Sequence, residues 1–288
     1  MLSRLIPEVW KERFRIRVRQ IAWEGRREAA PLYVPFQGDA HTFFVPKATE
    51  SGARAQELPI PPREMWLGYG ATAEEYLKSG EVHVAQMNEL SREHGNCLGQ
   101  AGRVLELGCA AGRMIRYVPD VAARAEIWGT DICAEHVYWC QEHFPSRFHF
   151  ATTTIVPHLP FEDRFFDFIY CGSVFTHIED LADAWLLELR RVLSPTGQLY
   201  FTVHDDDTVS RLDGPDSGHW LAGYMKSQPL YQEAKGQWGM LVIGRGPSSV
   251  VFYDTEFLLR KVSAVFQVLG RRPHAYGYQT AILAKRPD

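Results

Sequence analysis

Hydrophobic and polar residues follow two alternating patterns along the chain from Ala101 onward. Short apolar runs are typical of buried strands, and apolar residues that recur every three or four positions are typical of helices. The predicted strands are Arg103–Leu107, Glu126–Thr130, Arg147–Phe150, Phe166–Cys171, Gln198–His204, Gln267–Arg271 and Tyr278–Lys285. The predicted helices are Gly112–Val118, Ala134–His143, Glu179–Leu193 and Thr255–Phe266. This order of elements predicts an α/β fold with a mostly parallel, doubly wound sheet.

The last two predicted strands are joined differently from the others. Only a short segment around RRPHAYG, Arg271 to Gly277, separates them. A parallel crossover needs a longer connection, whereas an antiparallel pair can be joined by a short turn. We therefore expect the last strand to be antiparallel.

Residues 1–100 do not share this alternation. They contain a proline-rich loop, Leu58 to Pro62, and two probable helices, Ala73–Lys78 and Glu81–His94. Thr72 and Gly80 are suitable residues for the start and end of the first helix. We interpret residues 1–100 as a mainly helical accessory or cap segment. Residues 101–288 then form the main domain, with an insertion at 208–253.

Composition narrows the class of protein. The formal net charge of −4 gives no overall attraction to nucleic acid or to an anionic membrane. No apolar run reaches the ~18 residues of a membrane span. The five cysteines are an odd number and none forms a CxxC pair, which favours reduced thiols in the cytoplasm. The sequence predicts a soluble cytoplasmic protein.

The first thirty residues form a basic arm, with eight Lys or Arg side chains against four acidic ones. Their apolar residues fit a helical stripe, but the stretch FRIRVR also alternates as a strand would. No recognisable nucleic-acid-binding module accompanies the arm. We expect it to pack as a cap or to bind a partner, and it is a candidate surface for homo-oligomer formation.

A glycine-rich loop follows the first strand of the main domain. The stretch VLELGCAAGR places Glu106, Gly108, Ala110 and Gly112 at alternate positions. This spacing does not match the dinucleotide fingerprint G-x-G-x-x-G, and no lysine follows as a phosphate-binding loop requires. Small residues let the backbone approach a ligand closely, and the acid can meet an ammonium group.

These residues resemble the first motif of the class I S-adenosylmethionine-dependent methyltransferases. The resemblance extends to Asp131 at the end of the next strand and to the segment Pro160 to Val203, which contains SVFTH and a turn of the form L-x-P-x-G. It implies a Rossmann-like seven-stranded sheet, S-adenosylmethionine as cofactor and S-adenosylhomocysteine as product. The residues predicted to bind the cofactor are Glu106, Gly108, Cys109, Ala110, Gly112, Asp131, Ile132, Thr152, Thr153 and Cys171.

Two of these assignments have alternatives. A carboxylate at the position of Asp131 can accept hydrogen bonds from both ribose hydroxyls, but Asp131 also precedes a predicted helix and could be its N-cap. The family often has an acid after the third strand to meet the adenine amino group. This chain has ATTT there, Ala151 to Thr154, so a threonine hydroxyl or a backbone carbonyl would take that role.

Methyl transfer is an in-line displacement on a sulfonium, so the protein mainly aligns donor and acceptor. A hydroxyl acceptor also needs a base, and His177 and His204 are the two candidates. His177 could instead be the first residue of a helix capped by Thr176 and Glu179. His204 could be oriented by one of the aspartates that follow it, or could lie in a solvated turn. We predict no metal site, because the end of the fourth strand offers no acid.

The sequence therefore predicts a methyltransferase that acts on a hydroxyl or amine of a small-molecule or glycan-type metabolite. The alternatives are a protein or peptide methyltransferase that docks its substrate on residues 1–100, and a catalytically silent binding subunit with the same fold. The insertion carries Trp220, Tyr224, Tyr231 and Trp238. These rings either line an acceptor pocket or form a small satellite core.

Overall fold

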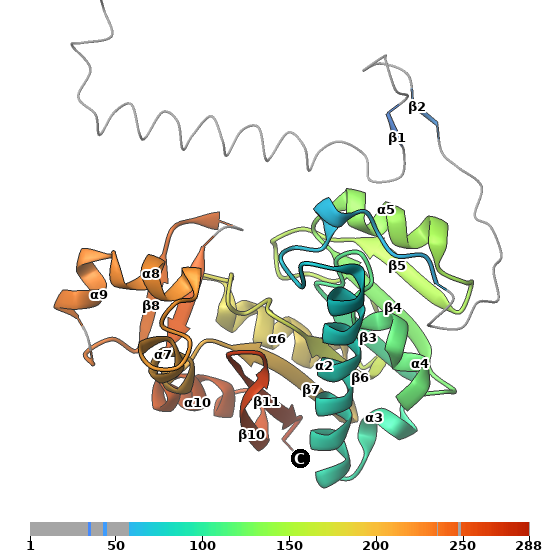
Figure 1. Ribbon diagram of the computed structural model, residues 1–288. Helices are drawn as coiled ribbons and strands as arrows, with labels where there is room; N and C mark the ends of the chain where they lie inside the picture. The colour runs from blue at the N-terminus through green and yellow to red at the C-terminus, as the bar shows by residue number, and fades with distance from the viewer. Residues whose placement is uncertain (1–33, 36–42, 45–57, 235, 247–248, 288) are drawn as a thin grey trace, which may run out of the picture.

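The computed structural model describes residues 34–35, 43–44, 58–234, 236–246 and 249–287 (Figure 1). The basic arm therefore lies outside the described residues. The helices are η2 (Arg63–Met65), α2 (Ala73–Glu93), α3 (Cys97–Gln100), η3 (Ile115–Tyr117), α4 (Val118–Val121), α5 (Ala134–His143), α6 (Ala182–Val192), α7 (Asp206–Asp213), α8 (Trp220–Lys226), α9 (Pro229–Glu233) and α10 (Thr255–Ser263). The strands are β1 (Val34–Pro35), β2 (Phe43–Phe44), β3 (Arg103–Leu107), β4 (Glu126–Asp131), β5 (Phe148–Thr152), β6 (Phe166–Cys171), β7 (Leu193–Val203), β8 (Met240–Ile243), β9 (Val250–Tyr253), β10 (Gln267–Tyr276) and β11 (Gln279–Lys285).

Seven strands form one sheet in the order β10-β11-β7-β6-β3-β4-β5. The pairs from β7 to β5 are all parallel, and β11 is antiparallel to both of its neighbours. The predicted fold class is confirmed, including the antiparallel last strand. One core packs α2, α3, α4 and α5 on one face of the sheet, and a second core packs α6 and α10 on the other. Because the helices cover both faces, the strands are apolar on both sides.

The two helices predicted before residue 100 are one continuous helix, α2. Thr72 caps it as expected by accepting a hydrogen bond from the Glu75 amide at 3.2 Å. Gly80 does not end the helix. A Cβ on Gly80 would lie 2.2 Å from the carbonyl oxygen of Arg113, so glycine is present there because α2 crosses the loop after β3 at close range.

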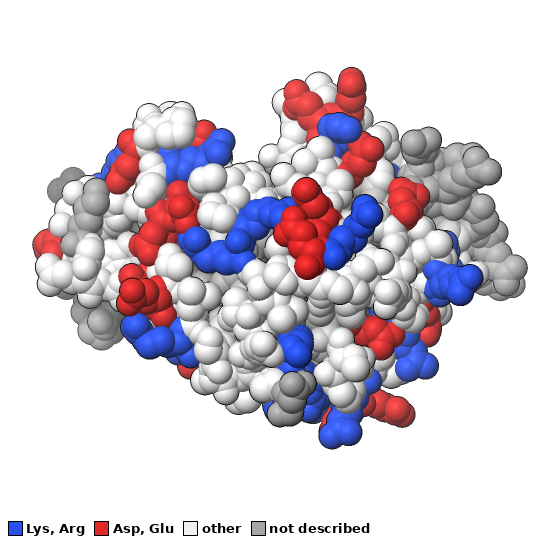
Figure 2. All heavy atoms as spheres, turned by 90° about the horizontal axis from the view of Figure 1, so that it is seen from below, with Lys and Arg blue, Asp and Glu red and all other residues white. Residues whose placement is uncertain are grey.

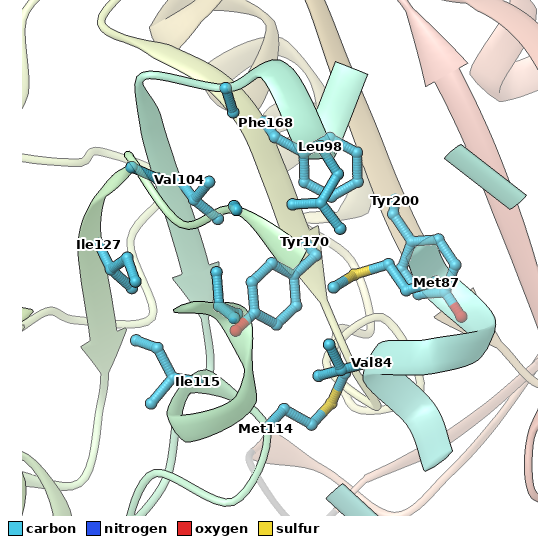
Figure 3. Packing of buried hydrophobic residues seen from close by; sticks show 14 of the residues in the cluster. Val84, Met87, Leu98, Val104, Met114, Ile115, Ile127, Phe168, Tyr170 and Tyr200 are labelled. Carbon is cyan, nitrogen blue, oxygen red and sulfur yellow. The ribbon is translucent and has the colours of Figure 1, made fainter. Parts of the chain in front are cut away.

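The same helix belongs to the core of the main domain. Val84 and Met87 of α2 lie in one cluster with Tyr170 of β6 and Tyr200 of β7, as Figure 3 shows. Within the described residues, the packing therefore does not change at residue 100. The part from residue 58 onward is integral to the domain that it was predicted to cap.

Three other helices are shorter than predicted, and α10 is one of them, since it ends at Ser263 rather than Phe266. The stretch Gly112–Val118 contains the 3-10 helix η3 and the first residue of α4, and Gly112 has a φ of +83° outside the helical region. Helix α6 begins at Ala182 rather than at residue 179. The Glu179 side chain instead accepts a hydrogen bond from the backbone of Gly246 in the insertion.

The insertion contains α8, α9, β8 and β9, and with α7 it builds a third apolar cluster (Figure 1). Tyr231 is buried in this cluster and Trp238 packs against it, as the satellite-core interpretation predicts. Strand β9 attaches the insertion to the sheet. The Val251 amide donates to the Thr176 carbonyl at 2.9 Å, and the Tyr253 amide donates to the His204 carbonyl at 2.8 Å. The insertion is thus fixed beside the carboxyl ends of β6 and β7.

The surface is electrostatically mixed where Figure 2 shows it, since basic and acidic side chains lie next to one another on that face. Among the residues that the structure describes, no helix has the length and apolar character needed to cross a membrane.

Candidate functional site

A cavity of about 800 Å³ opens at the carboxyl ends of the parallel strands. This is the edge at which open α/β sheets bind their ligands. Loops after β3, β4, β5, β6 and β7 contribute to its wall, together with the segment before α2, the β10–β11 turn and the insertion. The predicted site residues that line it are Glu106, Gly108, Cys109, Ala110, Asp131, Ile132, Thr153, His177 and His204.

Three predicted cofactor residues, Gly112, Thr152 and Cys171, do not line the cavity. A Cβ on Gly112 would lie 2.3 Å from Cζ of Phe144, so this glycine faces the core and serves the turn. Thr152 ends β5, and its neighbour Thr153 lines the cavity instead. The Cys171 side chain is fully buried in the second core, where burial raises the pKa of its thiol.

The loop after β3 is tied to the end of β4. The Gly108 and Cys109 amides donate to the Thr130 carbonyl at 2.7 and 3.0 Å. The Ala110 amide donates to Oδ2 of Asp131 at 2.8 Å. Gly108 and Ala110 both have positive φ values, of +80° and +45°, which the tight turn requires. The backbone of the loop is thereby fixed at the floor of the cavity.

Asp131 is not the N-cap of α5. The structure places Cys133 at that position, and its side chain makes no capping hydrogen bond. Asp131 accepts one backbone N–H on each oxygen, from Ala110 and from Cys133, both at 2.8 Å. Each oxygen of a carboxylate has a second lone pair, so both can accept a further bond from a ligand hydroxyl. Burial raises the pKa of this carboxyl, and the two amides oppose that effect.

Glu106 is a second buried acid at the cavity, with 4% of its surface exposed. Burial raises its pKa to about 8, while a hydrogen bond from Tyr170 and the charge of Arg113 oppose the increase. The Tyr170 hydroxyl donates to Oε2 at 2.8 Å. A ligand cation placed beside Glu106 would favour the ionised carboxylate and lower this pKa.

Sequence reasoning missed Arg113, a cation buried in the cavity wall. Its guanidinium lies 3.8 Å from the centre of the Tyr69 ring and donates to the Tyr276 hydroxyl. It also donates to Nδ1 of His83 at 3.0 Å, so that nitrogen holds the lone pair. Burial, and then the charge of Arg113, lower the pKa of His83 to about 3. The arginine directly follows the glycine-rich motif, and this position was its only sequence signal.

Five buried polar atoms of residues in the cavity wall have no hydrogen-bond partner among the described residues: Oη of Tyr76, Nδ1 of His136, Oγ1 of Thr153, Oε2 of Glu179 and Nε2 of His204. Nδ1 of His136 and Oγ1 of Thr153 belong to residues beside Asp131. Both residues interact with Asp131: the Thr153 amide donates to its carbonyl at 2.8 Å, and the charge of His136 lowers its pKa. A buried polar atom without a partner is costly. These two atoms therefore indicate where a polar ligand would bind.

His177 is open to the cavity at the other end of the site. Its Nδ1 lies 2.7 Å from the Ser249 carbonyl, and the Ser249 hydroxyl donates to the His177 carbonyl at 2.8 Å. A carbonyl can only accept, so the proton is on Nδ1 and Nε2 has the lone pair of the neutral ring. The surrounding protein lowers the pKa of His177 by burial, against the bond to Ser249. The ring is therefore neutral at pH 7.

The capping interpretation of His177 is wrong. The Thr176 hydroxyl lies 3.1 Å from the Ser173 hydroxyl, and Glu179 is bonded to Gly246 rather than to a helix start. The residue belongs to a loop before α6, whose first residue is Ala182. His177 is thus presented on irregular backbone at the carboxyl end of β6.

His204 is buried, with 3% of its surface exposed, so it does not lie in a solvated turn. Its Nδ1 lies 3.1 Å from the Val251 carbonyl, and no carboxylate orients it. The adjacent Asp205 instead accepts from Arg271 at 2.6 Å and caps α7. Burial lowers the pKa of His204 to about 3. His204 therefore presents an uncharged acceptor nitrogen, and its burial makes it a weak base.

Comparison with known proteins identifies the fold. Residues 105–201 match the family model described as a methyltransferase domain. The structure is similar to the crystal structure of magnesium protoporphyrin IX methyltransferase from Synechocystis PCC 6803 with bound S-adenosylhomocysteine. That match has a TM-score of 0.51 and 16% identity, and it covers 78% of this chain and 92% of the other. The 1,6-didemethyltoxoflavin-N1-methyltransferase of Burkholderia thailandensis also matches, at 17% identity and a TM-score of 0.49, over 88% of this chain and 99% of that one.

Proposed function

We propose that the chain is a class I S-adenosylmethionine-dependent methyltransferase and that it methylates a hydroxyl or amine of a small-molecule or glycan-type metabolite. The match of residues 105–201 to a methyltransferase domain and the shared fold support this proposal. The observation that supports a hydroxyl acceptor most directly is the orientation of His177. Its Nδ1 is engaged by the Ser249 carbonyl, so its basic nitrogen, Nε2, is free at the cavity. A hydroxyl needs such a base, whereas a neutral amine needs only to be aligned.

The cavity fits the cofactor in its polar groups. Asp131 has an unused lone pair on each oxygen for the two ribose hydroxyls, beside the unpartnered atoms of His136 and Thr153. Glu106, ionised when a cation binds beside it, would hold the ammonium group of the methionine part, and the Arg113 guanidinium would hold its carboxylate. Both charged groups of an amino acid are thereby matched in a buried site.

S-adenosylmethionine, when bound, would supply an activated methyl group whose carbon–sulfur bond pair would stay on sulfur as a neutral thioether. Nε2 of His177 would take the proton of the acceptor hydroxyl as that oxygen forms its bond to the methyl carbon. The Ser249 carbonyl stabilises the resulting imidazolium through the bond to Nδ1, which measures 2.7 Å.

Calorimetric titration tests the cofactor assignment first. Purified protein should release or absorb heat with S-adenosylhomocysteine at micromolar to millimolar concentrations. Absence of any heat would end the methyltransferase proposal for this chain. Binding without turnover on any acceptor would instead favour a silent binding subunit.

The base is tested with His177→Ala. Turnover on a hydroxyl acceptor should fall roughly 10²–10⁴-fold, with the affinity for S-adenosylhomocysteine unchanged. His158→Ala is the matched control, because the His158 side chain is 77% exposed and lies outside the cavity wall. Full turnover in the His177 variant would transfer the role to His204, and full turnover in both variants would leave alignment alone to explain catalysis.

A further inference from the structure

Six rings form a continuous row at the acceptor end of the cavity: Phe252, His204, Tyr278, His219, Trp220 and Tyr224. Successive centroids along this ring row are 5.0, 5.6, 4.8, 5.7 and 6.3 Å apart. These separations are typical of interacting aromatic pairs. The row begins in the buried strand β9, passes the end of β7 and the β10–β11 turn, and ends on α8 of the insertion. Four of its members, His204, Tyr278, His219 and Trp220, line the cavity.

The outer part of the row is open. Trp220 has 64% of its surface exposed, although the next residue, Leu221, is buried in the third apolar cluster. Leu221 and Leu181 also line the cavity. A large exposed indole at the wall of a cavity is a feature of ligand-binding surfaces.

Three polar side chains near the ring row, Gln279, Ser173 and Thr176, are hydrogen-bonded within the protein. Gln279 lines the cavity, but its amide nitrogen donates to Ser173 at 2.8 Å and its oxygen accepts from Thr202 at 2.6 Å. The Ser173 hydroxyl also contacts that of Thr176. A sugar presents many hydroxyls, and each needs a partner when it is buried. The free hydrogen-bonding groups at this end include Nε2 of His177, Nε2 of His204 and the acids Glu179 and Asp180, and rings make up much of the remaining wall.

Two acids, Glu179 and Asp180, complete the wall at this end. Oε1 of Glu179 accepts from the Gly246 amide at 3.3 Å, and its other oxygen is buried without a partner. The guanidinium of Arg113 is engaged by Tyr69, His83 and Tyr276. Glu179 and Asp180 add negative charge to the cavity wall, which disfavours an anionic acceptor.

We infer that the acceptor is an uncharged, planar aromatic compound with a phenolic hydroxyl, and that its ring stacks along the ring row between Trp220 and His204. This inference rests on the proposed function and narrows its substrate class. The acidity of a phenolic hydroxyl also supports a phenol as the acceptor. A phenol has a pKa near ~10, as in tyrosine, and an alcohol is closer to the ~15.7 of water. His177 is a weak base because its pKa is lowered, so it is better matched to a phenol.

The test compares three probes by calorimetry on protein saturated with S-adenosylhomocysteine. They are β-naphthol, its saturated counterpart decalinol, and methyl glucoside. We expect β-naphthol to bind about two- to tenfold more tightly than decalinol, since a stacked aromatic pair adds this much affinity beyond buried area. Methyl glucoside should show no binding at the same concentrations.

Variants locate the binding. Trp220→Ala should weaken the binding of β-naphthol by about three- to tenfold. Trp220→Phe should retain most of the affinity because it keeps a ring. Leu230→Ala is the control, since Leu230 is equally exposed on the same insertion but does not line the cavity. Equal binding of β-naphthol and decalinol, tighter binding of the glucoside, no binding of β-naphthol, or an unaffected Trp220→Ala variant would each overturn the inference.

The two levels of proposal fail differently. If S-adenosylhomocysteine does not bind, the proposed methyltransferase function fails, and binding of β-naphthol to the unliganded protein still reports on the ring row. If S-adenosylhomocysteine binds and β-naphthol does not, the aromatic acceptor is wrong while the methyltransferase assignment stands.

Discussion

Gly112→Ala separates the structural role of the glycine-rich loop from its role at the cavity. Gly112 has a φ of +83°, and an added Cβ would lie 2.3 Å from Cζ and 2.8 Å from Cε2 of Phe144. The left-handed backbone costs about 1–2 kcal/mol with a side chain, and overpacking a core costs about 1–3 kcal/mol. The expected loss of stability is therefore about 2–5 kcal/mol, which a domain of ordinary stability survives.

The assay is equilibrium denaturation combined with calorimetry. Gly112 is not part of the cavity wall, so the folded fraction of Gly112→Ala should bind S-adenosylhomocysteine with unchanged affinity. A double-mutant cycle with Phe144→Leu should show a favourable coupling of about 1–3 kcal/mol, because the smaller side chain removes the clash but not the backbone strain. Gly108→Ala is the comparison: Gly108 lines the cavity and its Cβ would meet only the end of the Val174 side chain, at 2.5 Å.

Both variants should lose stability, because both glycines have a positive φ. The expected contrast is that only Gly108→Ala also loses cofactor affinity. The reasoning is refuted if Gly112→Ala weakens S-adenosylhomocysteine binding while its midpoint of denaturation stays at the wild-type value. That result would mean that Gly112 contacts the ligand after all, as its place in the motif suggested.

Three more predictions follow from the buried charges. Asp131→Asn should weaken the binding of S-adenosylhomocysteine at least tenfold, because it removes one oxygen that can accept a hydrogen bond from a ribose hydroxyl, and such a bond contributes about 1.5–3 kcal/mol. An unchanged dissociation constant in calorimetry would show that Asp131 only holds the loop in place. Glu106 has a pKa of about 8, so it is mostly protonated at pH 7, and a bound ammonium should lower that pKa and release a proton. Calorimetry in buffers of different ionisation enthalpy measures this proton, and Glu106→Gln should abolish it. The pKa of His177 is lowered, so this base is already neutral at pH 7. Turnover should therefore rise with pH only below about 6.5 and then level off. A rise centred well above that pH would assign catalysis to another group.

The sequence predicted the local elements well where their cause is local. The bounds of β3, β6 and α5 agree with the predicted ranges, because each is a clear apolar pattern that ends at a loop. The order of elements also gave the sheet, since alternating strands and helices admit few arrangements. Gly80 shows the limit of this reasoning, because a helix-ending residue in sequence proved to be a point of close approach to Arg113.

The sequence identified only some of the residues that line the candidate site. The glycine-rich motif located Glu106 and Gly108, but the pattern could not show that Gly112 faces Phe144 instead of the cavity. In the same way, the Cys171 side chain at the end of β6 packs in the core. The loop that follows it lines the cavity instead. Motif positions define a backbone path, and the side on which each residue lies depends on φ and on the neighbouring strands.

The sequence by itself determined the fold class, the loop after β3 and the acid at the end of β4, because strand periodicity and glycine spacing act over a few residues. Only the tertiary structure decided which residues share the cavity. Arg113, His136 and the ring row come from segments far apart in the chain, and Ser249 and Val251 of the insertion fix the tautomers of His177 and His204. Buried hydrogen bonds and pKa values depend on what surrounds a group in space, and a sequence records only what precedes and follows it.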